Sequence, residues 1–127
     1  MSVKKNNKFL IIYPNKELST KKVFDNFNIK KVKNEKPMYF NNIKIFNSLE
    51  YVSQSIEPEI KKILNILKSF EKIIAFGMSG SGSSCFGIFK NSQDLLNDKE
   101  FTRLKSEHNY FIWHGNKKEF GYNRFIY

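Results

Sequence analysis

The spacing of apolar residues predicts strands and helices in alternation along the chain. The continuous apolar run 9–13 is β-branched at its centre and ends at Pro14-Asn15, which is typical of a buried strand closed by a turn. Apolar runs at 73–76 and 85–89 predict two more strands on either side of a glycine-rich segment, and 110–113 predicts a last strand. Four short strands are therefore expected.

Apolar positions three and four residues apart predict the helices. The clearest pattern begins at Pro58, which is favourable as the first residue of a helix, and it marks one face with Ile60, Ile63, Leu64, Leu67 and Phe70. Ser19 or Thr20 offers an N-cap to a shorter helix. The Lys- and Asn-rich segment 28–46 lacks periodicity and predicts a long surface loop, with a strand at 43–46 as an alternative for its end.

Two further helices follow from local signals. Asn47 and Glu50 have the form of a capping box, which predicts a helix that continues through Ile56. Apolar residues between 95 and 104 predict another helix, broken near Asn97-Asp98. The whole order implies a single α+β domain over 1–127, with helices on one face of a small, largely antiparallel sheet and a core at about 8–114.

Charge and cysteine content narrow the function classes. The net charge is +10, but only Arg103 and Arg124 among the 22 basic residues are Arg, and the lysines are scattered along the chain. Because Arg is the side chain that forks onto phosphates and stacks on bases, we do not expect a nucleic-acid partner. The single cysteine, Cys85, excludes an internal disulfide. No apolar run approaches the roughly 20 residues of a membrane helix and no secretory signal is evident, so we expect a cytoplasmic protein without a membrane partner.

The glycine-rich segment 77–84 is the strongest candidate for chemistry. Glycine lets the backbone take positive φ so that N–H groups converge on an anion, and four serines add hydroxyl donors. It is no Walker A loop, since it lacks a Gly-Lys-Ser/Thr ending, and no GxGxxG fingerprint, since Cys85 stands three residues after Gly82. Residue chemistry alone leaves two interpretations, a nucleotide-phosphate site and a hairpin loop that merely permits a tight turn.

The run Met78-Ser79-Gly80-Ser81-Gly82-Ser83-Ser84-Cys85-Phe86-Gly87-Ile88-Phe89 resembles the third conserved motif of the GHMP kinase family. Three preceding segments agree in order: 10–24 is similar to the family's strand, Pro turn and helix start, 47–50 to its Asn-Asp-Leu-Glu, and 58–64 to the helix that enters the motif. The resemblance covers roughly 8–89.

Three positions depart from the family pattern. Ser48 stands where the family usually has Asp, and Phe76-Gly77 stands where it usually has Ala-Arg, which removes a basic side chain. The tail 115–127 matches no part of the pattern.

The resemblance implies the C-terminal domain, of ferredoxin-like plait type, of a two-domain kinase that transfers a phosphoryl group from ATP with Mg²⁺ to an alcohol. The members most resembled phosphorylate the 2-hydroxyl of a cytidine-diphosphate-linked polyol in non-mevalonate isoprenoid biosynthesis. Their N-terminal half carries the main phosphate loop and the catalytic Asp and Lys. Its Pro-x-Gly-x-Gly-Leu-Gly-Ser-Ser type of pattern does not occur in this sequence.

By the same resemblance, the residues that face the phosphate and substrate cleft are Ser79, Gly80, Ser81, Gly82 and Ser83, and no catalytic or metal-binding residue is expected in this chain. Its partners would be ATP, the cytidine-diphosphate-linked polyol and a separate N-terminal half, without which we expect little or no activity. A free-standing nucleotide- or protein-binding module of the same fold is the alternative.

Other reactive residues have simpler explanations. His108 and His114 are six apart with no Cys or carboxylate at ligand spacing, which does not predict a zinc site. Cys85 at the head of a strand is expected to be a small buried apolar residue, and Trp113 a core residue.

Overall fold

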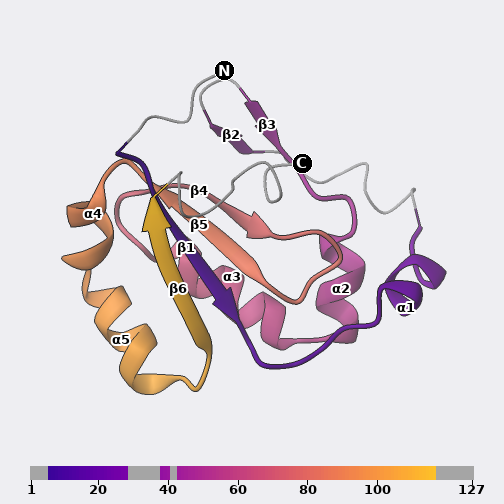
Figure 1. Ribbon diagram of the computed structural model, residues 1–127. Helices are drawn as coiled ribbons and strands as arrows, with labels where there is room; N and C mark the ends of the chain where they lie inside the picture. Colours follow the sequence, from indigo (N-terminus) through magenta and orange to yellow (C-terminus); the bar gives the residue numbers. More distant parts are fainter. Residues whose placement is uncertain (1–5, 29–37, 41–42, 117–127) are drawn as a thin grey trace.

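The computed structural model describes residues 6–28, 38–40 and 43–116. Its centre is a four-stranded antiparallel sheet with the order β4–β5–β1–β6 (Figure 1). The strands are β1 (Lys8–Tyr13), β4 (Ile73–Met78), β5 (Cys85–Phe89) and β6 (Phe111–Asn116). All four overlap the predicted strands. Strand β4 continues two residues farther into the glycine-rich segment than the sequence suggested, and β6 continues three residues beyond the predicted end, to Asn116.

The described helices are α1 (Thr20–Asp25), α2 (Glu50–Ile56), α3 (Glu59–Lys68), α4 (Ser92–Leu96) and α5 (Lys99–Glu107). Helices α3, α4 and α5 cover one face of the sheet, as predicted, whereas α1 and α2 lie beyond the end of β4 and β5 (Figure 1). The main core lies between the sheet and α3, α4 and α5, which lie beside and behind it in Figure 1. The fold is therefore α+β, and the predicted class is confirmed.

Helix α3 supplies most of the helical side of the core. Its buried residues, at spacings of three and four, are Ile60, Ile63, Leu64 and Leu67. Burying one such side chain stabilises the fold by about 1.5–3 kcal/mol before the loss of chain entropy. Pro58 occupies the N-cap position and the helix begins at Glu59, one residue later than predicted.

The other face of the sheet carries a second, smaller core. Phe9, Ala75, Phe86 and Ile88 are buried there, and the partly buried residues around them include Met38, Ile45 and Trp113. Met38 and Ile45 belong to a two-stranded antiparallel ribbon, β2 (Met38–Phe40) and β3 (Ile43–Ile45). The ribbon contacts β4, so the sheet is covered on both faces near this edge. The sequence suggested β3 but not β2; the rest of the predicted loop, residues 29–37 and 41–42, lies outside the described residues.

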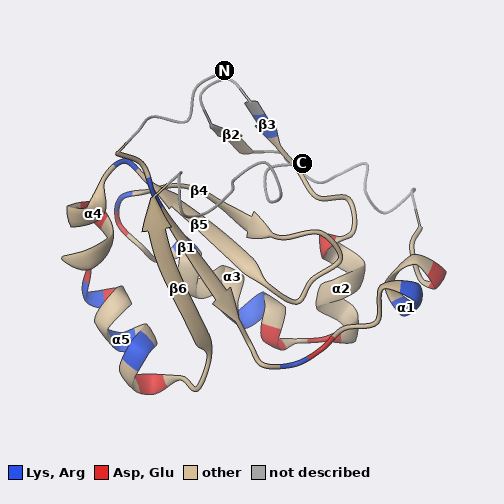
Figure 2. Ribbon diagram, viewed as in Figure 1, with Lys and Arg blue, Asp and Glu red and all other residues tan. Residues whose placement is uncertain are grey.

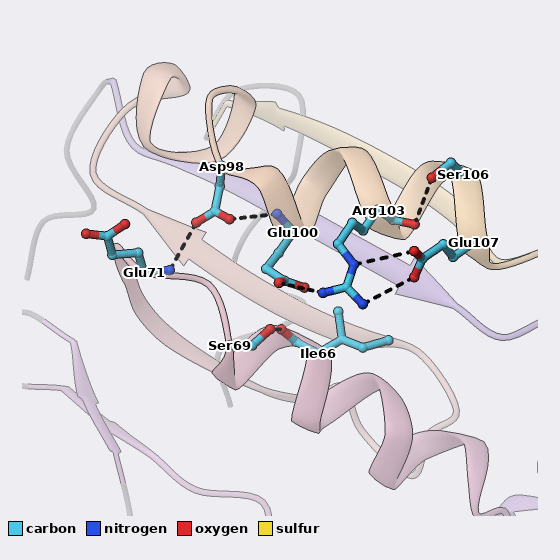
Figure 3. A network of polar contacts seen from close by, with 8 residues as sticks. All are labelled: Ile66, Ser69, Glu71, Asp98, Glu100, Arg103, Ser106 and Glu107. Carbon is cyan, nitrogen blue, oxygen red and sulfur yellow. Dashed lines mark hydrogen bonds and ion pairs between the residues drawn. The ribbon is translucent and has the colours of Figure 1, made fainter.

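Asp98 produces the predicted break between α4 and α5. Its carboxylate accepts the N–H of Glu100 at 2.8 Å as the N-cap of α5, and its other oxygen accepts the N–H of Glu71 at 3.0 Å (Figure 3). Since Glu71 lies in the turn between α3 and β4, one side chain both starts a helix and attaches it to the neighbouring layer.

Apart from Lys8 at the start of β1 and Lys44 on β3, the charged side chains of the described residues lie on helices and loops, and β4 and β5 carry none (Figure 2). On α5, the Arg103 guanidinium lies 3.1 Å from the carboxylate of Glu100 and 3.4 Å from that of Glu107 (Figure 3). Exposed ion pairs of this kind usually stabilise a fold by less than about 1 kcal/mol, so these pairs contribute little to the stability of the chain. In the described ranges, no helix has both the length and the apolar character needed to cross a membrane.

Candidate phosphate-binding loop

The segment Ser79 to Ser84 joins β4 to β5 as a closed, hydrogen-bonded loop. Met78 and Cys85 are the last paired residues of the two strands. Beyond them, the N–H of Ser79 donates to the carbonyl of Ser84 at 2.8 Å, and the N–H of Gly82 donates to the carbonyl of Ser79 at 3.0 Å. These two bonds give the loop one backbone shape.

Two glycines in the loop are required for different reasons. Gly80 has φ +57° and Gly82 has φ +96°. These conformations are unfavourable in free energy for any residue that has a Cβ. An added Cβ at Gly80 would have no other atom within 4 Å, whereas at Gly82 it would lie 3.1 Å from Leu18 Cδ2 and from Met78 Sδ. Gly80 is thus needed for backbone conformation alone, and Gly82 for conformation and close packing.

Residues far away in the sequence hold the loop through side-chain hydrogen bonds. Ser53 on α2 donates from its hydroxyl to the carbonyl of Ser81 at 2.8 Å. The hydroxyls of Thr20 and Ser81 lie 3.1 Å apart, which attaches the loop to the first turn of α1. The buried hydroxyl of Ser83 donates to the carbonyl of Lys16 at 2.5 Å.

Asn47 and Glu50 do not form the predicted capping box. Helix α2 begins at Glu50, and its N-cap residue makes no side-chain capping bond. The Asn47 amide instead donates to the carbonyls of Met78 and Gly80, at 2.8 and 2.6 Å, while its oxygen accepts the N–H of Leu49 at 3.0 Å. The Glu50 carboxylate accepts the N–H of Met78 at 3.2 Å. Both side chains reach across to the end of β4, so the prediction was wrong about their partners.

Several donor groups of the loop remain for a ligand, and four of them are central to the site. Within the described part of the chain, the N–H groups of Gly80 and Ser81 donate to no protein acceptor, and the hydroxyls of Ser79 and Ser84 have no hydrogen-bond partner. Gly80 is exposed, and the three serines are half-buried. Consecutive N–H groups beside a residue of positive φ form the kind of concavity that binds anions.

The five predicted site residues therefore lie in one turn but differ in what they can offer. Gly80 and Ser81 retain unused N–H groups and Ser79 an unused hydroxyl, whereas the N–H of Gly82 and the hydroxyl of Ser83 are already bonded within the protein. Ser84, which was not among the predicted site residues, adds a hydroxyl.

The reactive side chains near the loop have structural roles. Cys85 is completely buried, and this burial raises the pKa of its thiol, so it stays protonated as the expected small apolar residue. The imidazole of His108 stacks on the ring of Tyr110, while that of His114 packs edge-on against Phe101. The described residues include no group of three His, Cys, Asp or Glu side chains that could hold a metal ion.

A shallow depression of about 390 Å³ lies beside the loop, between the end of β1 and the start of β6; it is lined by Pro14, Asn15, Lys16, Glu59, Glu107, His108, Asn109 and Tyr110. Its wall holds a hydrogen bond of 2.6 Å from the Tyr110 hydroxyl to the Glu59 carboxylate. That bond is the main cause of the lowered pKa of Glu59, and a hydrogen bond from Lys62 lowers it further. Burial is the main cause of the raised pKa of Tyr110. The pair joins the start of α3 to the sheet.

Comparison with known proteins places this loop in a family. Residues 33–101, just over half of the chain, match the family model described as GHMP kinases C terminal. The chain belongs to the GHMP kinase family. This GHMP kinase chain is 33% identical over 112 residues to a protein from Anaplasma phagocytophilum (strain HZ) named 4-diphosphocytidyl-2-C-methyl-D-erythritol kinase. The aligned region covers 82% of the chain and 36% of that protein. A protein of the same name from Wolbachia pipientis wMel is 48% identical over 48 residues, 38% of the chain and 17% of that protein.

A solved structure agrees on the fold of the GHMP kinase chain. The crystal structure of a 4-(cytidine 5'-diphospho)-2C-methyl-D-erythritol kinase matches with a TM-score of 0.63 at 17% identity, over 85% of the chain and 41% of that structure. In each comparison the chain thus spans less than half of its relative's length. The chain corresponds to one part of these longer relatives.

Proposed function

We propose that this chain provides a phosphate-binding loop to an ATP-dependent kinase that phosphorylates the 2-hydroxyl of 4-diphosphocytidyl-2-C-methyl-D-erythritol. The observation that carries the proposal is the pair of unused N–H groups at Gly80 and Ser81, in a loop held by long-range hydrogen bonds. The names of the relatives support the reaction and the substrate.

The chemistry of the loop suits a phosphate group. Phosphoryl transfer depends on positioning and on the stabilisation of negative charge around the transferred group. Backbone N–H groups do this without taking up or losing a proton, and the hydroxyls of Ser79 and Ser84 add donors of the same kind. In this proposal, these four groups donate hydrogen bonds to the oxygens of a phosphate, either of ATP or of the diphosphate of the substrate. Gly82 and Ser83 maintain the shape of the loop.

The remaining functions of the site belong, in this proposal, to an N-terminal half. We assign no ligand of Mg²⁺ to the described residues, because none of their carboxylates and imidazoles form a suitable group. The base that activates the substrate hydroxyl and the main phosphate loop come from that half. The chain then acts as one domain that has little or no kinase activity alone.

The first experiment measures ATP binding and turnover with the full chain, alone and mixed with the N-terminal part of the Anaplasma kinase. We expect phosphate-dependent shifts of the Gly80 and Ser81 amide resonances in the chain alone, and turnover only in the mixture. Substitution of both Ser79 and Ser84 by Ala should weaken ATP binding about a hundredfold, since the loss of each hydrogen bond to a charged group corresponds to about tenfold. Ser106→Ala is the matched control, since that hydroxyl lies on the exposed side of α5 and donates to the carbonyl of Arg103 (Figure 3).

Two results would contradict the proposal. Turnover by the chain alone would show that it contains the catalytic groups that we assign to the other half. Unchanged Gly80 and Ser81 resonances at saturating ATP and substrate would show that the loop binds neither molecule.

A further inference from the structure

The proposed phosphate site depends on the orientation of single peptide groups in the loop. A trans peptide is planar, so its carbonyl and its N–H point in opposite directions. Whatever holds the carbonyl of one residue therefore also directs the N–H of the next residue. This rule allows the direction of each ligand-facing N–H to be traced to a particular contact.

The two unused N–H groups trace to two different contacts. The N–H of Gly80 shares a peptide with the carbonyl of Ser79, which accepts the N–H of Gly82 inside the loop. The N–H of Ser81 shares a peptide with the carbonyl of Gly80, and that carbonyl accepts the side-chain amide of Asn47 at 2.6 Å. One donor is thus oriented by the loop itself, and the other by a side chain 33 residues earlier in the sequence.

We propose that Asn47 is a positioning residue, which turns the N–H of Ser81 away from the protein and toward a phosphate oxygen. This inference rests on the proposed function of the loop. Three hydrogen bonds fix the amide itself: one N–H on the Gly80 carbonyl, one on the Met78 carbonyl at 2.8 Å, and the oxygen accepting the N–H of Leu49 at 3.0 Å. A primary amide has both the two donors and the acceptor that this arrangement needs, whereas a carboxylate has acceptors only.

The Gly80–Ser81 peptide is the one that most needs such a restraint. Gly80 is exposed and has φ +57°, and no atom lies within 4 Å of the position that a Cβ would occupy, so side-chain packing does not fix it. Glycine also permits rotations that other residues resist. Without Asn47 this peptide can turn, and its carbonyl oxygen would then face the ligand in place of the Ser81 N–H. A carbonyl dipole opposes a phosphate, so the turned form binds it poorly.

The test uses two substitutions at this site and one matched control. Asn47→Ala removes all three hydrogen bonds. Asn47→Asp keeps the shape and the acceptor for Leu49 but sets a carboxylate oxygen against the two carbonyls. Asn91→Ala is the control, because the Asn91 side chain also bonds to backbone, as the N-cap of α4, but at the opposite end of β5 from the loop.

The readout is an NMR titration of the full chain with inorganic tripolyphosphate, followed at the Gly80 and Ser81 amides. In the native chain both resonances should shift. Asn47→Ala should raise the dissociation constant about tenfold, since hydrogen bonds to charged groups have this magnitude, and should reduce the shift of Ser81 more than that of Gly80. Asn47→Asp should weaken binding at least as much, and Asn91→Ala should bind as the native chain does. A loss of stability alone would affect Asn91→Ala as well, so it cannot produce this pattern.

The possible failures are distinguishable. If tripolyphosphate binds the native chain and Asn47→Ala equally well, the positioning role is refuted while the loop remains a phosphate site. If the native chain gives no response to tripolyphosphate, ATP or substrate, the proposed function is refuted and this inference with it.

Discussion

Replacing Gly82 by Ala tests how the glycine-rich loop is packed. The new Cβ would lie 3.1 Å from Leu18 Cδ2, 3.1 Å from Met78 Sδ and 3.3 Å from Ile60 Cδ1, at a position with φ +96°. Gly80→Ala is its matched partner, because it has positive φ, +57°, and no atom within 4 Å of the new Cβ. The difference in the free energy of unfolding between the two variants therefore measures the effect of close packing at Gly82 together with that of its more extreme φ.

The magnitudes follow from these two contributions. At Gly80 the left-handed conformation costs Ala about 1–2 kcal/mol, partly offset by about 0.4–1 kcal/mol from the stiffer unfolded chain. We therefore expect Gly80→Ala to lower the free energy of unfolding by about 1 kcal/mol or less. At Gly82 overpacking adds about 1–3 kcal/mol, near the lower end because all three neighbours are ends of flexible side chains. The expected loss for Gly82→Ala is about 1–3 kcal/mol.

Urea unfolding followed by circular dichroism measures both variants against the native chain. Gly82→Ala should show a clearly lower midpoint at an unchanged slope, and Gly80→Ala a small shift. If the two variants are equally stable, the neighbours of Gly82 move aside without cost, and the argument that this glycine is required for packing is refuted.

Two other predictions concern hydrogen bonds outside the loop. Asp98→Ala removes both the cap of α5 and the contact to the Glu71 N–H, so we expect a loss of about 1–2 kcal/mol in thermal or urea unfolding. Asp98→Asn keeps an acceptor for only one of the two N–H groups, so its stability should lie between those of the native chain and the Ala variant. An Ala variant as stable as the native chain would contradict this role. Tyr110→Phe removes the hydrogen bond to Glu59, which should raise the pKa of that carboxyl and cost about 1 kcal/mol at pH 7. Because the native pKa of Glu59 is lowered, its stabilisation is present above the ordinary pKa and is lost as the pH falls through the lowered value. The difference between native chain and variant should therefore shrink below about pH 4, and a difference that stays constant to lower pH would contradict the assignment.

The sequence predicted those elements whose signals are local. The apolar face of α3 repeats at helical spacing, and the break between α4 and α5 was expected near Asn97-Asp98, so both were visible in a short window of sequence. The glycine-rich loop was recognisable in the same way, since a turn at positive φ needs glycine at that point of the chain.

The contacts that complete the candidate site were not predictable in this way. Asn47 and Glu50 fit a local capping pattern, but their partners at the end of β4 are about 30 residues away, and tertiary hydrogen bonds overrode the local preference. The resemblance of 47–50 to a family segment was the available signal that these residues have another role. Strand β2 was missed because its three residues are too few to show an alternating pattern.

The anchoring of the loop also determines how far the site could be transferred to another protein. The contacts from Lys16, Thr20, Asn47 and Ser53 join loop residues that are 28 to 67 positions away in the chain. A hairpin made of β4, β5 and their connection would keep every glycine and serine of the motif and lose all of these contacts. Grafted into a foreign sheet, that hairpin would keep only the two backbone hydrogen bonds within the loop. An engineer who wants the proposed phosphate site must therefore transplant the segments around α1 and α2 as well.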